Sequence, residues 1–165
     1  NGCDDSSVFP KNGEEAFQEW KPHFVYIQGG NTFWLYHCIE KGGWGPDLVK
    51  TCTGEDGAVY CGTSAGAIIM GQSMDTACWK GWDDPAVVPD RETYTEWKEV
   101  KGFGLVGGSS FFPHMDDTWQ RLVDDKISQL DEQSSVLCLR DEDACCVEGS
   151  GRKVQIISSP VPVEA

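Results

Sequence analysis

The chain has 165 residues, a formal net charge of −14, and a composition that is 39% hydrophobic. This length suits one domain with its own core, and no run of about eighteen apolar residues is present to span a membrane. Because phosphate groups are bound by basic surfaces, the acidic charge argues against nucleic acid and anionic membranes as partners.

The predicted elements alternate between helices and strands. They begin with an irregular lead at 1–13, a helix at 14–20, a strand at 23–28, a helix at 33–41, the end of a short helix at 48–52, a strand at 58–61 and a helix at 65–71. After a polar segment at 75–101 come a strand at 109–112, a helix at 118–130, a strand at 135–139, a hairpin at 144–148 and 153–157, and an extended tail at 159–165. This alternation predicts a single α/β domain over residues 14–158 with a mostly parallel sheet.

The polar segment at 75–101 has several aromatic residues and no clear periodicity. We interpret it as a long loop or insertion over one end of the sheet. Long ordered loops at such places often cover substrates, although a surface excursion without a role in binding is an equally good interpretation.

The stretch from Val59 to Met70 is typical of a nucleophile elbow. A short apolar strand runs into a Gly-x-Ser-x-Gly turn, and an apolar helix follows. Small residues at Gly62, Ala65 and Gly66 allow a sharp bend that exposes the central side chain. Ser64 is therefore the candidate nucleophile.

A serine nucleophile needs a general base. His114 follows a strand at the end of the sheet where ligands gather, whereas His23 begins a strand and His37 lies within a helix. His114 is thus the preferred base. The orienting acid stays open among carboxylates that follow strands or lie in the polar segment: Asp75, Asp83, Asp84, Asp116, Asp141, Glu142 and Asp143.

Backbone amides of Gly30 and Ala65 are natural donors for an oxyanion hole, because both follow strands at the same end of the sheet. The order along the chain is then Ser64, His114 and an acid. An α/β-hydrolase has the order Ser, acid, His, so the elbow is like that of a hydrolase while the order is not.

The eight cysteines include no C-x-x-C pair, which makes a zinc site unexpected. We expect Cys61 and Cys138 to be buried in strands. One disulfide that involves Cys52 or Cys78 is a further expectation.

Four motifs occur in order and at suitable spacing: Gln28–Leu35, Gly62–Ala67, Pro113–His114 and Leu139–Asp141. Together they resemble the peptidase E (aspartyl dipeptidase) and cyanophycinase family of serine peptidases, over roughly residues 14–157. The resemblance implies a flavodoxin-like three-layer α/β sandwich, and it implies that the family's first strands are missing from this chain. Peptidase E carries an Arg shortly after the nucleophile helix, whereas residues 71–80 here contain none, and only Lys80 and Arg91 are nearby.

By this resemblance Ser64 matches the nucleophile, His114 the base and Asp141 the acid, with Gly30 and Ala65 in the oxyanion hole. Further positions for an acid or for substrate contact are Asp83, Asp84, Asn31 and Thr63. The implied reaction is cleavage of a peptide or isopeptide bond next to aspartate through an acyl-enzyme, without metal or cofactor. The alternative is a catalytically inactive relative that serves as a structural or assembly subunit.

The expected partner is a small peptide substrate. A homodimer, association with a larger complex and association with a missing N-terminal segment are all compatible with the sequence. The resemblance implies a cytoplasmic location, while eight cysteines and the lack of an initiator Met leave an organelle lumen or secretion open.

Overall fold

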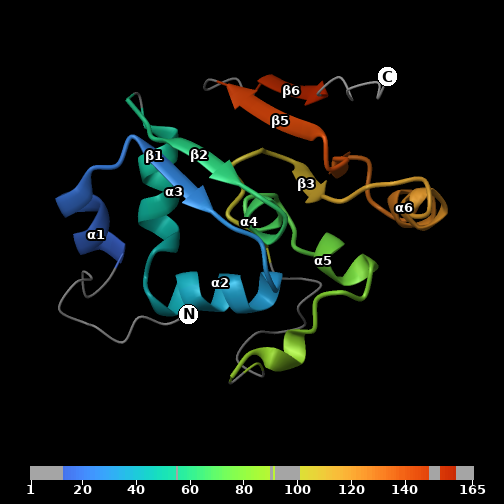
Figure 1. Cartoon of the computed structure of the whole chain (residues 1–165), viewed down its shortest axis with the longest axis horizontal. Coiled ribbons are helices and arrows are strands. Elements are labelled where there is room, and N and C mark those ends of the chain that lie inside the picture. The colour runs from blue at the N-terminus through green and yellow to red at the C-terminus, as the bar shows by residue number, and fades with distance from the viewer. Residues whose placement is uncertain (1–12, 55, 90, 92–100, 149–152, 159–165) are drawn as a thin grey trace, which may run out of the picture.

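The computed structural model describes residues 13–54, 56–89, 91, 101–148 and 153–158. Its first half contains α1 (Gly13–Trp20), β1 (Phe24–Ile27), α2 (Thr32–Lys41), α3 (Gly45–Thr53), β2 (Val59–Gly62), α4 (Ala65–Ile68), α5 (Thr76–Trp79) and the 3-10 helix η1 (Pro85–Val87). Its second half contains β3 (Ser109–Phe112), α6 (Gln120–Ile127), β4 (Ser135–Cys138), β5 (Asp143–Glu148) and β6 (Lys153–Ser158). Figure 1 shows their arrangement.

The described strands form three separate two-stranded sheets. β1 pairs in parallel with β2, and β3 pairs in parallel with β4. β5 and β6 form an antiparallel hairpin. The α/β class and the parallel pairing agree with the sequence prediction, whereas the described strands do not join into one continuous sheet.

Helices α2, α3 and α4 cover one face of the β1–β2 pair. The core there is built around Phe33, Leu48 and Ile69, each at most 2% exposed. Val25, Ile27 and Tyr60 pack against this core from the strands. The short helix α4 also packs against β3, so it connects the two parallel pairs (Figure 1).

The other face of the β1–β2 pair is exposed. Phe24 pairs with Val59 and Tyr26 pairs with Cys61, so these four side chains share that face. Phe24, Tyr26 and Val59 are 50–62% exposed. Parallel strands are normally covered on both faces, so this apolar surface is unusual for the class.

A second core joins α6 to the β3–β4 pair. Phe112, Met115 and Val123 are buried there, with Trp119 packed against them. Val106, Phe111 and Leu139 form another cluster, which the hairpin contacts through Cys145 and Val147. The β5–β6 hairpin therefore attaches by one strand, and β6 is exposed along its length.

The segment expected to be a loop at 75–101 contains α5 and η1. Residues 90 and 92–100 of it lie outside the described part, as do the lead at 1–12 and the tail at 159–165. The predicted helix at 65–71 is shorter than expected, because only residues 65–68 are α-helical and turns follow.

The expectation of a disulfide at Cys52 or Cys78 is wrong for the described residues, since both are free thiols. Cys61 and Cys138 are half-buried rather than fully buried. Burial raises the pKa of the Cys138 thiol. Among the described residues, no helix is long and apolar enough to cross a bilayer.

Candidate active site

Ser64 lies on a sharply bent turn between β2 and α4. Its backbone has φ 52° and ψ −115°, a conformation that non-glycine residues rarely adopt. A Cβ atom on Gly66 would lie 2.3 Å from the carbonyl oxygen of Ile27, and one on Gly62 would lie 2.4 Å from the carbonyl oxygen of Gly66. The two glycines are therefore required because the turn packs directly against β1 and against itself.

The phenol of Tyr60, on β2, stabilises this turn through a hydrogen bond. Its hydroxyl donates a hydrogen bond of 2.6 Å to the carbonyl oxygen of Gly66. Burial raises the pKa of Tyr60 far above its usual range, so the hydroxyl stays protonated and keeps this role as a donor.

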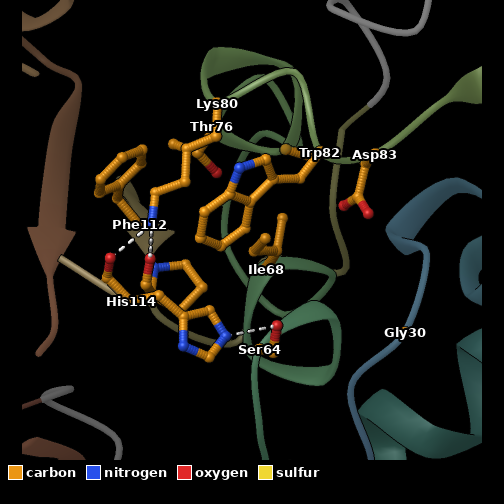
Figure 2. Close-up of a pocket in the computed structure, with 11 residues that line it drawn as sticks. Gly30, Ser64, Ile68, Thr76, Lys80, Trp82, Asp83, Phe112 and His114 are labelled. Atoms are coloured by element: carbon orange, nitrogen blue, oxygen red, sulfur yellow. Dashed lines mark hydrogen bonds between the residues drawn. The ribbon is translucent and has the colours of Figure 1, made fainter. Parts of the chain in front are cut away.

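His114 follows β3 and reaches Ser64 from the other parallel pair. Its Nε2 atom lies 2.9 Å from the Oγ atom of Ser64 (Figure 2). Its Nδ1 atom lies 2.6 Å from a carboxylate oxygen of Asp141, which follows β4. Three side chains from three strand ends are thus connected by two hydrogen bonds.

The turns that carry His114 and Asp141 are joined through the backbone. The amide of Leu139 donates to the carbonyl of Phe112, and the amide of Met115 donates to the carbonyl of Leu139. These bonds extend the β3–β4 pairing past the ends of the strands. The side chain of His114 is 41% exposed and that of Asp141 is 77% exposed, so the site opens to solvent.

A cavity of about 240 Å³ lies beside Ser64. Its lining combines an apolar wall with a few polar groups: Gly30, Ser64, Ile68, Thr76, Ala77, Lys80, Trp82, Asp83, Phe112, Pro113 and His114. Thr76 is 3% exposed, and its hydroxyl has no hydrogen-bond partner among the described residues. Figure 2 shows Ile68 between Trp82 and Ser64, with Gly30 at the right of the view.

Lys80 is the cation of this cavity. Its ammonium group donates to the carbonyl oxygens of Pro113 and His114. Burial lowers the pKa of Lys80, although the carboxylates of Asp116 and Asp141 partly oppose that effect. The sequence shows that residues 71–80 lack an Arg and that Lys80 and Arg91 are the cations nearby, but it assigns no contact to Lys80. The aromatic residues around position 80 were the signal that could have indicated its surroundings.

Gly30 lines the cavity with φ 140°, where a side chain would be strained. Ala65 is the first residue of α4, directly after Ser64. The amide of such a first residue has no partner within its own helix. Ala65 therefore directly follows Ser64, and Gly30 lines the same cavity as Ser64.

The remaining predicted positions have different surroundings. Asp83 lines the cavity, and its carboxylate accepts a 2.6 Å hydrogen bond from the hydroxyl of Thr32. The carboxylate of Asp84 accepts a hydrogen bond from the amide of Ala86, and its backbone carbonyl accepts one from the side-chain amide of Asn31. Thr63 is exposed and does not line the cavity.

Asn31 begins α2, where its side-chain oxygen accepts a hydrogen bond from the amide of Trp34. Asn31 is therefore the N-cap of α2. Neither Asp83 nor Asp84 contacts His114 in the described structure, so they do not complete its hydrogen-bonded chain.

The other carboxylates that could have oriented His114 have local roles instead. Asp116 accepts from the amide and hydroxyl of Thr118, and Asp143 accepts from the amide of Arg140. Asp75 lines a separate cavity near Ser110. His37 is buried in α2 and stacks on Trp34.

Within the described ranges, no three His, Cys, Asp or Glu side chains are grouped so that they could hold a metal ion. The site instead has the residues of nucleophilic acyl transfer: a serine on an elbow, a histidine within hydrogen-bond reach and a carboxylate behind it.

A serine, a histidine and a carboxylate hydrogen-bonded in this order at strand ends form the arrangement that serine hydrolases use. The sequence matches the model of peptidase family S51 over residues 11–155, and the chain belongs to that family. No curated protein sequence matches it.

Among solved structures, the fold is similar to the crystal structure of a candidate peptidase E protein from Listeria monocytogenes EGD-e, with a TM-score of 0.64 and 20% sequence identity. The match covers 90% of this chain and 65% of that chain. The chain thus spans about two thirds of the length of this structural relative.

Proposed function

We propose that this protein is a serine hydrolase that cleaves a peptide or isopeptide bond next to aspartate. The observation that supports it most is the chain of hydrogen bonds from Ser64 through His114 to Asp141, at 2.9 Å and 2.6 Å. Membership of peptidase family S51 supports the same reaction class.

In the proposed reaction, the Oγ atom of Ser64 attacks the scissile carbonyl carbon while its proton passes to Nε2 of His114. The resulting oxyanion accepts hydrogen bonds from the amides of Gly30 and Ala65. The intermediate collapses, the C–N bond breaks, and the leaving amine takes the proton from His114. Water then attacks the acyl-enzyme with His114 again as base, which releases the acid and regenerates Ser64.

Asp141 orients the imidazole and stabilises its positive charge in both steps. Asp83 is proposed to contact substrate rather than His114, because its carboxylate lines the cavity.

Selectivity for aspartate rests on the resemblance of the four motifs. A small peptide substrate, a flavodoxin-like three-layer arrangement and a cytoplasmic location accompany the proposal as predictions of the same resemblance. The cavity of about 240 Å³ is compatible with one short side chain beside Ser64.

A fluorophosphonate probe tests the reaction class. We expect the wild-type protein to bear one phosphonyl adduct on Ser64, located by peptide mass spectrometry, and Ser64→Ala to bear none. A panel of dipeptides with Asp, Asn or Glu at the first position then tests the selectivity. A folded sample whose Ser64 does not react would exclude the proposed hydrolase.

The second candidate function is an inactive relative that acts as an assembly subunit. The exposed apolar face formed by Phe24, Tyr26 and Val59 favours it. It predicts no probe labelling together with fixed stoichiometry in a larger complex, or in a homodimer, measured by light scattering after affinity purification.

A further inference from the structure

Lys80 connects the segment after α5 to the turn that carries His114. Its ammonium nitrogen lies 2.9 Å from the carbonyl oxygen of Pro113 and also donates to the carbonyl oxygen of His114 (Figure 2). Hydrogen bonds from a charged donor are stronger than neutral ones. This one side chain therefore binds two successive carbonyl groups 33 and 34 residues away in the chain.

Aromatic rings surround the same ammonium group. It lies 4.4 Å from the ring centroid of Trp82, 4.5 Å from that of Phe112 and 5.1 Å from that of Trp119. These distances are within the range of cation–π attraction. Two of the three N–H donors of the lysine are used by carbonyl groups.

The turn that Lys80 holds has an unfavourable backbone conformation. His114 has φ 55°, in the left-handed region that non-glycine residues seldom adopt. Such conformations persist only where the surroundings hold them in place. The direction of the imidazole toward Ser64 depends on this backbone angle, because the Cα–Cβ bond rotates with it.

We propose that Lys80 is a positioning residue: it binds the Pro113–His114 backbone and holds His114 in the left-handed conformation that directs its ring at Ser64. The consequence for catalysis rests on the proposed function, whereas the consequence for His114 does not. Trp82 contributes to the same arrangement, since its ring also lies 6.1 Å from that of His114.

This role differs from binding of a substrate carboxylate. A substrate anion would have to displace one of the two carbonyl groups or enter among the rings. We therefore expect the ammonium to keep its backbone partners during the reaction, so that its loss affects the rate constant more than the affinity for substrate.

The test compares Lys80→Met, which keeps the aliphatic stem without the ammonium, with Lys80→Arg, which keeps charge and donors. Lys50→Met is the matched control, because Lys50 is an exposed lysine at the end of α3. Circular dichroism establishes folding of each variant. Should Lys80→Met not fold, Lys80→Gln takes its place.

The first measurement does not need activity. Diethyl pyrocarbonate modifies imidazole nitrogens, and mass spectrometry gives the rate at His114 relative to the exposed His23 of the same molecule. We expect several-fold faster modification of His114 in Lys80→Met, and wild-type rates in Lys80→Arg and Lys50→Met. Equal rates at His114 in wild type and Lys80→Met would overturn the proposal.

The second measurement is the rate of Ser64 phosphonylation by the fluorophosphonate probe, which carries no substrate carboxylate. A displaced base should lower it by about 10²-fold in Lys80→Met, with recovery in Lys80→Arg. An unchanged probe rate combined with a raised KM for aspartyl peptides would instead make Lys80 a substrate-binding group and overturn the proposal. If the wild-type protein itself does not react, the proposed function fails, and the His114 modification rate still decides the role of Lys80.

Discussion

Two residues of the site share an uncommon backbone conformation. Among the described non-glycine residues, positive φ angles occur at Lys21, Ser64 and His114, and the last two are hydrogen-bonded to each other. Each such conformation costs on the order of 1–3 kcal/mol and tends to occur at functional sites. The strain at Ser64 and His114 is thus concentrated where the proposed chemistry takes place.

Comparison of Asp141 with its neighbour Glu142 tests whether the hydrogen-bonded carboxylate itself is required. Asp141→Asn should lower the rate of Ser64 phosphonylation by about 10³-fold, because the amide no longer stabilises the imidazolium or its tautomer. Glu142→Gln is the control, since Glu142 is not hydrogen-bonded to His114 in the described structure. Equal losses in the two variants would show that local charge matters rather than the specific carboxylate.

Gly29 tests how closely the first turn approaches the nucleophile. A Cβ atom at Gly29 would lie 2.9 Å from the Cβ atom of Ser64. Gly29→Ala should therefore displace Ser64, lower its phosphonylation rate at least about tenfold and cost about 1–3 kcal/mol in urea unfolding. Gly54→Ala, whose nearest contact is at 3.6 Å, should change the phosphonylation rate little.

At the scale of elements, the start of α2 connects a helix cap with the wall of the cavity. Asn31 caps the helix and also holds the carbonyl of Asp84, while Thr32 binds the carboxylate of Asp83. The segment after α5 is thereby attached to α2 by side chains from two adjacent residues. This explains how the described residues around Asp83 and Asp84 keep a defined position beside α2.

Asn31→Ala should lower the free energy of unfolding by about 1 kcal/mol through loss of the cap. Asn31→Asp keeps an oxygen that can cap the helix, so it should retain most of the stability while it loses the donor to Asp84. Urea denaturation followed by tryptophan fluorescence measures both. A large loss in Asn31→Asp alone would assign the stabilisation to the Asp84 contact instead.

At the scale of the whole molecule, the candidate active site depends on two separate parallel pairs that α4 connects. Ser64 follows one pair, while His114 and Asp141 follow the other. Their mutual distances are therefore sensitive to how the β1–β2 pair sits against the β3–β4 pair. The exposed apolar face of Phe24, Tyr26 and Val59 is also a property of the whole molecule, because none of the described helices covers this face of β1 and β2.

Burial of cysteine thiols and of the Tyr60 phenol makes the stability of the whole fold sensitive to alkaline pH. Desolvation raises the pKa of the thiols of Cys38, Cys52, Cys78, Cys138 and Cys145, and also that of Tyr60. A group whose pKa is higher in the folded state contributes stability below its unfolded value and loses it as the pH rises further. For the thiols this loss begins near pH 9.0, their ordinary value.

Lys80 acts in the opposite direction, because burial lowers its pKa and deprotonation then favours the folded state. Since the thiols and Tyr60 outnumber this one lysine, we expect the urea midpoint to fall between pH 8 and pH 10.5 in the presence of reductant. A midpoint that stays constant or rises over this range would contradict the burial of these groups.

The sequence by itself predicted the features that depend on residues close together in the chain. The glycines around Ser64 predict the elbow because larger residues at these nearby positions would clash in so sharp a bend. Asn31 predicts a helix start because its side chain caps the amide of Trp34, only three residues away. The alternation of helices and strands likewise indicates an α/β fold with chemistry at the strand ends.

Residue type and spacing left the acid open and only the resemblance pointed to Asp141, whereas the tertiary structure shows the contact that each carboxylate makes. Asp141 and Asp143 are both carboxylates after β4, yet Asp141 contacts His114 while Asp143 binds the amide of Arg140. The contacts of His114 span 50 residues to Ser64 and 27 to Asp141, and those of Lys80 are similarly long-range. Such choices depend on how the parallel pairs pack through α4, and periodicity and turn residues contain no information about that packing.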